Sequence, residues 1–325
     1  MEKNGGNSTI RDMTSGSPVK LIIQFMIPMF LGNIFQQFYN IADSIVAGQF
    51  LGVRALAAIG STGSLMFFVT GWLNGLSSGF AILVAQWFGA KKYDRMRHYV
   101  AMSIYLMVAF AVAMTIGFEI ANRPIMHLMN YSEEIMPDVT SYMGIIYAGL
   151  IVTAAYNALA AFLRALGDSK SPLYFLIISA AINVLLDIVF IIYVGMGVEG
   201  CAYATVIAQA ISAILCLIYI VKKFPILHLK KENFTVSFQE LGKLLALGIP
   251  MALQFSITRS VSLWCRVRSM YTGKITWQGF RQQENCRIFS VPCLSLLVRP
   301  SLPMLDRTAE RGKWTESNRV CAVRS

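Results

Sequence analysis

Four polar residues in otherwise apolar segments have types and spacing that could support chemistry. Asn183 and Asp187 interrupt an apolar run that begins at Leu173, and Thr205 lies in the next run. Asp43 lies in the first apolar run of the chain. An ionisable residue in the middle of a segment long enough to cross a bilayer is costly to keep there, so such a residue indicates a functional site.

The spacing of three of these residues predicts that they meet. Asn183 and Asp187 are four residues apart, so they share one face of a helix. Asp187 lies nine residues before Met196, and Thr205 lies nine residues after it. At ~1.5 Å per residue, Asp187 and Thr205 both lie ~13 Å from the ends of two antiparallel helices. We therefore expect these side chains to converge at one depth.

Asp43 is expected at a similar depth, because it lies nine residues before Gly52 with some irregular backbone between them. Two carboxylates, an amide and a hydroxyl at one level predict either a proton site or an oxygen cage for a hard monovalent cation. The alternative is that Asp43 caps a helix end and that Asp187 pairs with a backbone donor. The residue types leave H⁺ and Na⁺ equally open.

The composition is that of an integral membrane protein. Of the 325 residues, 56% are hydrophobic and only 14% are charged, and the mean hydropathy is +0.57. Soluble domains carry about 25% charged residues. Residues 1–18 are polar, and the apolar run after them is longer than the core of a signal peptide, so we expect that run to remain as a helix.

The predicted fold class is an all-α membrane protein with six spans and the start of a seventh. The spans are expected near residues 19–47, 55–88, 99–121, 139–163, 172–194 and 200–221. With a cytoplasmic N-terminus, fourteen Lys and Arg residues up to residue 258 fall on the cytoplasmic side, whereas Arg54 and Arg123 fall outside. This bias predicts a multi-pass protein of the cell (plasma or inner) membrane with its N-terminus in the cytoplasm.

The chain is expected to divide into five parts. These are a cytoplasmic segment (1–18), a six-helix lobe (19–221), a cytoplasmic linker (222–240), the start of a seventh helix (241–258) and a basic tail (259–325). Residues 243–253 (KLLALGIPMAL) echo residues 21–31 (LIIQFMIPMFL), 222 positions earlier. Because transporters are often built from repeats, the echo predicts that a second six-helix half begins there.

The tail changes character after Thr258. It carries twelve Lys and Arg against four Asp and Glu, with no sustained helical period, and holds most of the net charge of +11. We interpret it as out-of-frame translation that shortens the protein; sequencing past the codon for Thr258 tests this. The alternative is a basic cytosolic tail that binds anionic lipid. Since the excess charge is confined to the tail, we expect no nucleic-acid partner.

Several other motifs are interpreted structurally. Residues 195–200 (GMGVEG) match a dinucleotide-binding pattern, but the preceding apolar run is too long and no acid follows about 20 residues later, so a tight hairpin is expected. Gly71, Gly75 and Gly79 predict close helix packing. Pro28 is expected to kink the first span, as a hinge or as a static bend.

No enzyme is expected, and no cofactor beyond the coupling ion. The chain has no C-x-x-C pair and no H-E-x-x-H motif, and no arrangement typical of a hydrolase nucleophile.

Four segments resemble the multidrug and toxic compound extrusion (MATE) family of secondary transporters. They are residues 41–48 (IADSIVAG), 164–172 (RALGDSKSP), 182–187 (INVLLD) and 197–205 (GVEGCAYAT). The resemblance covers roughly residues 15–258. It implies two six-helix lobes around a central cavity, and export of cationic or amphipathic compounds in exchange for H⁺ or Na⁺.

Carried over by position, the resemblance assigns the cation site to Asp43, Asn183, Asp187 and Thr205, the residues that spacing already groups. It assigns the substrate cavity to Gln37, Tyr142 and Asn157. Two alternatives stay open: a lipid-linked saccharide flippase of similar helix plan, and a non-transporting membrane subunit that pairs with another half.

Overall fold

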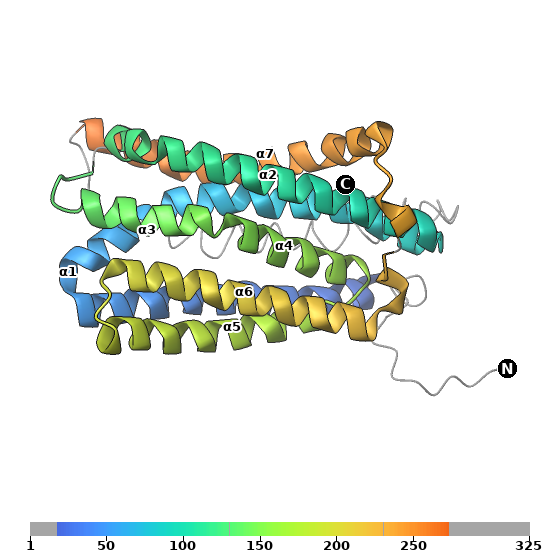
Figure 1. The fold of residues 1–325 in the computed structure, drawn as a ribbon, viewed down its shortest axis with the longest axis horizontal. Coiled ribbons are helices and arrows are strands. Elements are labelled where there is room, and N and C mark those ends of the chain that lie inside the picture. The colour runs from blue at the N-terminus through green and yellow to red at the C-terminus, as the bar shows by residue number, and fades with distance from the viewer. Residues whose placement is uncertain (1–17, 130, 230, 273–325) are drawn as a thin grey trace.

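The computed structural model describes residues 18–129, 131–229 and 231–272, and all regular secondary structure in these ranges is helical (Figure 1). The elements are α1 (Pro18–Gly89), α2 (Tyr93–Leu128), α3 (Met136–Ala148), α4 (Leu150–Ala165), α5 (Lys170–Ile188), a π-helix (Val189–Tyr193), α6 (Val198–Lys223), two short 3₁₀ helices (Pro225–Leu227 and Lys231–Phe234) and α7 (Phe238–Thr272). The cytoplasmic segment expected at residues 1–18, apart from its last residue, and tail residues 273–325 lie outside the described residues.

Helix α1 folds back on itself at Gly52. Gly52 is the residue of α1 with non-helical backbone angles (φ 84°, ψ −174°), a region that favours glycine. A Cβ on Gly48 would lie 3.3 Å from Leu56 Cδ2, although eight residues of straight helix would separate them by ~12 Å. The helix therefore consists of a first arm (18–51) and a second arm (53–89) that run in opposite directions (Figure 1).

This turn corrects one expectation about the first two spans. The irregular backbone expected between Asp43 and Gly52 is wrong, because the chain stays helical up to a break of one residue. The backbone is also helical at Pro28. A hinge at Pro28 therefore stays a prediction.

The predicted fourth span is bent. Helices α3 and α4 meet at Gly149 and are inclined by 48° to one another. A Cβ on Gly149 would lie only 2.4 Å from Val206 Cγ2 of α6, so the bend coincides with a close approach to α6.

The described helices agree with the six spans predicted up to residue 221. Four helices are long and apolar enough to cross a membrane, or five if the bent pair α3–α4 counts as one span. Because α1 contains two arms, each predicted span has a counterpart. The predicted all-α membrane fold is confirmed.

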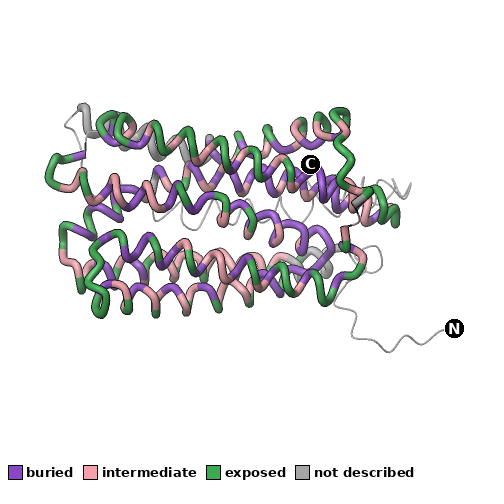
Figure 2. The backbone as a smooth tube through the Cα atoms, in the orientation of Figure 1, coloured by how far each residue is buried: buried purple, intermediate pink, exposed green. Residues whose placement is uncertain are grey.

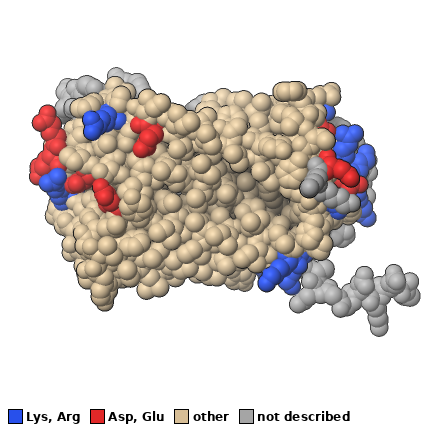
Figure 3. Space-filling model, in the orientation of Figure 1, with Lys and Arg blue, Asp and Glu red and all other residues tan. Residues whose placement is uncertain are grey.

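The surface fits a lipid environment. Large apolar side chains such as Phe38, Ile120 and Leu185 are 61%, 77% and 63% exposed. Charged side chains on the face shown gather toward the two ends of the bundle and leave a broad uncharged belt between them (Figure 3). Buried positions recur along the length of the helices, so the elements pack along their whole length (Figure 2).

Helix α7 extends further than the sequence predicts. It continues through Arg259 to Thr272, so the expectation that regular helix stops near Thr258 is wrong. Adding a residue to an existing helix costs little compared with starting one, and residues 259–272 contain neither Gly nor Pro. The described part of α7 reaches Thr272.

The predicted close packing of the glycine stripe is confirmed, and its partner is α7. A Cβ on Gly75 would lie 2.3 Å from Ala252 Cα, and a Cβ on Gly79 would lie 2.6 Å from Gly248 Cα. Two backbones this close exclude any side chain between them. Glycine at positions 75 and 79 therefore sets the distance between the second arm of α1 and α7.

The segment between α6 and α7 packs on α2. Arg97 Nε donates a hydrogen bond to Ile226 O (2.9 Å), and the ring of Tyr105 lies edge-on against Phe234. Glu240, in the first turn of α7, forms salt bridges with Arg95 and His98 of α2. The Lys-rich linker expected at residues 222–240 therefore attaches the start of α7 to the end of the bundle.

Asp168, in the connection between α4 and α5, links the start of α5 to α6. Its carboxylate accepts hydrogen bonds from Ser171 N (3.0 Å), Ser171 Oγ (2.6 Å) and Tyr219 Oη (3.1 Å). A carboxylate that receives the free N–H groups of a helix start stabilises that end. Because Tyr219 belongs to α6, this contact also holds the beginning of α5 against the end of α6.

We expect Gly75→Ala to destabilise the chain by about 1–3 kcal/mol, the usual cost of overpacking, because the new methyl group must displace α7. The measurement is thermal unfolding of the purified protein in detergent. The matched control is Gly60→Ala on the same arm, where a Cβ meets nothing within 4 Å. That change should be neutral or should stabilise by about 0.5–1 kcal/mol. Equal destabilisation by both variants would contradict the close crossing.

Candidate functional site

Three helices each contribute a pair of side chains spaced four residues apart to one cluster. The pairs are Tyr39 and Asp43 on the first arm of α1, Asn183 and Asp187 on α5, and Cys201 and Thr205 on α6. Residues four apart lie on the same face of a helix, so each helix presents both members of its pair to the other two. The structure thus brings together all four residues that the sequence predicts to converge.

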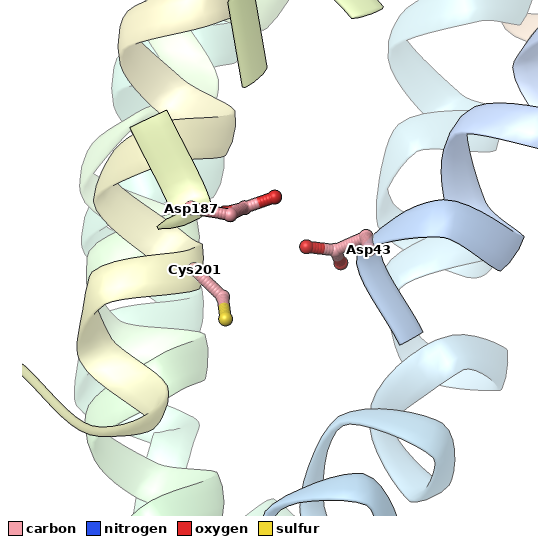
Figure 4. A group of neighbouring side chains, drawn as sticks. All are labelled: Asp43, Asp187 and Cys201. Carbon is pink, nitrogen blue, oxygen red and sulfur yellow. The ribbon is translucent and has the colours of Figure 1, made fainter. Parts of the chain in front are cut away.

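The two carboxylates face each other inside the bundle. Asp43 is 6% exposed and Asp187 is fully buried. They extend toward one another from α1 and α5, with Cys201 of α6 beside them (Figure 4). One carboxylate oxygen from each and the sulfur of Cys201 all lie within 4.8 Å of one another. Oδ1 of both aspartates has no hydrogen-bond partner among the described residues.

Hydroxyl and amide groups complete the cluster. Tyr39 Oη donates to Thr205 Oγ1 (3.1 Å). With the Asn183 amide turned so that its nitrogen faces Asp187, that nitrogen donates to Asp187 Oδ2 (3.1 Å), and its oxygen accepts from Thr205 N (3.3 Å). This orientation of the amide satisfies both of its polar atoms. The groups supply oxygen atoms from three helices around the two carboxylates.

The arrangement requires a positive charge or a proton. Two negative charges about 5 Å apart repel by roughly 3 kcal/mol at an effective dielectric constant near 20. Within the described ranges, neither Asp43 nor Asp187 forms a salt bridge with Lys, Arg or His. A proton shared between the carboxyl groups, or a cation between them, would remove the repulsion. The arrangement can therefore accept a proton or a cation between the two carboxylates.

The three predicted cavity residues lie on different helices. Tyr142 is buried on α3. Asn157 is buried on α4, and Gln37 is partly exposed on the first arm of α1. Their contact with a substrate stays a prediction.

Two members of the cluster were not assigned to the cation site from sequence. Tyr39 lies four residues before Asp43, and Cys201 lies four residues before Thr205. The same spacing that joins Asn183 to Asp187 could have identified both. What it could not indicate is the rotation of each helix, which decides whether such a face points into the bundle or into lipid.

We expect Asp187→Asn to raise the unfolding temperature in a buffer free of small cations, because the amide removes one of two facing carboxylates while keeping the shape. The free energy of unfolding should increase by about 1–3 kcal/mol, the usual cost of burying a polar group without a partner. Thermal unfolding in detergent measures it. Ser179→Ala, which removes a buried hydroxyl on α5 bonded to Ala208 O (2.8 Å), should instead destabilise. A loss of stability in Asp187→Asn would mean that the pair is already compensated.

The chain is similar to curated multidrug resistance proteins. It is 28% identical over 250 residues to a probable multidrug resistance protein, YpnP, of Bacillus subtilis (strain 168), covering 76% of this chain and 55% of that protein. It is 30% identical over 236 residues to a second from the same organism, YoeA, covering 70% and 51%. The chain thus spans about half the length of these curated relatives.

Solved structures share the fold. One is described as an outward-facing conformation of a multidrug resistance MATE family transporter of the MOP superfamily, with a TM-score of 0.79 and 22% identity. Another is a MOP superfamily transporter from Pyrococcus furiosus Vc1, also with a TM-score of 0.79 and 22% identity. Each alignment covers 96% of this chain and 69% of the other.

Residues 28–189 match the family model named MatE. The match includes residues 28–51 of the first arm of α1 and all of α5, which carry the two facing aspartates. Together with the relatives and the shared fold, it shows that the chain belongs to the MatE family, the multidrug and toxic compound extrusion family whose motifs its sequence carries.

Proposed function

We propose that this chain provides the cation-coupling part of a secondary antiporter that exports cationic or amphipathic small molecules in exchange for H⁺ or Na⁺. The observation that carries the proposal is the pair of facing, buried carboxylates, Asp43 and Asp187, on separate helices of a membrane bundle. Groups that bind a cation from two helices can tie its binding to the relative position of those helices.

The relatives support the kind of transport. The two curated proteins that are 28% and 30% identical to this chain are described as probable multidrug resistance proteins. One of the structures with the same fold is described as a multidrug resistance transporter. A multidrug exporter must accept substrates of varied shape, so the substrate is proposed as a class and not as one compound. Tyr142, Asn157 and Gln37 are proposed to line its path.

The charge distribution supports the orientation. Most of the described Lys and Arg residues lie at the end of the bundle that holds the α1–α2 and α4–α5 connections and the end of α6 (Figure 1). Arg54 lies two residues after Gly52, in the turn at the other end. Basic residues concentrate on the cytoplasmic side of membrane proteins. The proposed orientation places that end in the cytoplasm of a cell membrane. Asp43 and Asp187 then lie in the outer half of the bilayer.

Cation binding can be tested on the chain by itself. If Na⁺ binds between the carboxylates, raising the Na⁺ concentration at constant ionic strength should raise the unfolding temperature. The free energy of unfolding should increase by about 2.7 kcal/mol when Na⁺ is at 100 times its dissociation constant. We expect Asp43→Asn and Asp187→Asn to lose this response. Glu199→Gln, a matched change at an exposed carboxylate in the first turn of α6, should keep it. No response in the unaltered chain would exclude Na⁺ and leave H⁺ as the proposed ion.

Exchange is tested in liposomes that contain the chain. An inward gradient of H⁺ or of Na⁺ should drive ethidium out, and the effective ion identifies the coupling ion. The Asp43→Asn and Asp187→Asn variants should show no exchange, whereas Glu199→Gln should match the unaltered chain. Exchange that persists in both aspartate variants would remove these carboxylates from the mechanism. Absence of exchange in the unaltered chain would show that the chain does not transport by itself.

A further inference from the structure

The cation cluster contains a sulfur ligand in addition to its oxygens. Cys201 is fully buried on α6, and its Sγ lies within 4.8 Å of a carboxylate oxygen of Asp43 and of Asp187. Figure 4 shows the thiol beside the space between the two carboxylates. A hard monovalent ion prefers oxygen ligands and binds thiol sulfur poorly. A thiol at this place adds a different binding chemistry.

The three ligand atoms are close to the separation that a tetrahedral metal needs. With a metal–sulfur bond of about 2.3 Å and metal–oxygen bonds of about 2.1 Å, ligand atoms in a tetrahedron lie ~3.6 Å apart. The atoms here lie within 4.8 Å of one another. Metal binding must therefore close a difference of up to ~1.2 Å between ligand atoms.

Each of the two carboxylates has a buried oxygen without a partner among the described residues. Asp43 and Asp187 are each more than nine-tenths buried, and Oδ1 of each has no hydrogen-bond partner within the described ranges. Buried polar atoms are normally paired, so an unpaired oxygen on each of two facing carboxylates requires an explanation. A divalent cation would satisfy both oxygens and would balance most of the negative charge.

We propose that Asp43, Asp187 and Cys201 form a binding site for a thiophilic divalent cation of the Zn²⁺ or Cd²⁺ class. On binding, the Cys201 thiol releases its proton to solvent and the thiolate sulfur bonds to the metal. The Thr205 hydroxyl or a water molecule supplies the fourth ligand. Because the three residues belong to α1, α5 and α6, the metal links these helices to one another. This inference rests on the geometry and holds whether or not the chain transports.

The test uses the full chain with Cys201 as its remaining cysteine. Cys216, Cys265, Cys286, Cys293 and Cys321 are replaced by alanine, because any free thiol also binds Cd²⁺. Titration of this protein with Cd²⁺ in detergent should produce a sulfur-to-cadmium ultraviolet absorption band that saturates at one equivalent. Asp43→Asn or Asp187→Asn in this background should weaken binding by more than about tenfold, since changes to outer-shell partners alone cost 10–100-fold.

The matched control retains Cys216 in place of Cys201. Cys216 is also a buried free cysteine on α6 but belongs to no described group of three metal-ligating side chains. The control should show no one-equivalent band. Equal binding by this control, or unchanged binding in both aspartate variants, would overturn the proposal, because Cd²⁺ would then be binding a thiol alone.

Thermal unfolding provides an independent measurement on the same proteins. Zn²⁺ should raise the unfolding temperature of the unaltered chain by linking three helices, and Cys201→Ala should abolish that rise. Without metal, Cys201→Ala should still unfold in one cooperative transition, which shows that the variant is folded. A Zn²⁺ response that persists in Cys201→Ala would overturn the proposal. The Na⁺ test of the proposed function is made on the unaltered chain and on the aspartate variants, whereas this test depends on Cys201, so a failure of one is distinguishable from a failure of the other.

Discussion

The repulsion between Asp43 and Asp187 is the constraint on which the rest of the bundle depends. The surrounding helices must hold the two carboxylates together against it. Two carboxylates that face each other in an apolar interior separate unless the backbones that carry them are fixed. The Gly52 turn fixes the end of the first arm of α1 that follows Asp43, and the contact of Asp168 with Ser171 and Tyr219 fixes the beginning of α5 against α6. The unfavourable pair can therefore persist until a proton or a cation neutralises it.

Helix α1 joins the cluster around Asp43 to the close crossing with α7. Its first arm carries Asp43, and its second arm meets α7 through Gly75 and Gly79 at a distance that admits no side chain. One residue, Gly52, separates the arms. Since interiors are close-packed and yield little, a shift of α7 must move the second arm as well. The candidate cation site and the α7 crossing therefore lie on two arms of one helix that are joined by a single turn.

Sequence alone predicted the helical class, the six spans and the four residues of the cluster, because each rests on a regular period. Asp187 and Thr205 lie equally far from one hairpin, and that symmetry survives in the fold. Features that depend on contact between distant segments could not be predicted from the sequence. The bend at Gly149 coincides with a close approach to Val206, and the inward direction of Cys201 depends on the rotation of α6. The spacing of residues along a helix carries no information about its rotation.

The cluster combines two sets of ligands that share the same carboxylates. The oxygens of Asn183, Thr205 and Tyr39 with the two aspartates suit a proton or a hard monovalent ion, whereas Cys201 adds affinity for soft divalent metals. A metal that bonds to sulfur and to both carboxylates would leave no anionic oxygen free for a coupling ion. The two kinds of cation must therefore exclude one another. A site that is emptied and refilled in each cycle needs a weakly held ion, and a thiolate complex that joins α1 to α5 and α6 would hold the helices in a single arrangement.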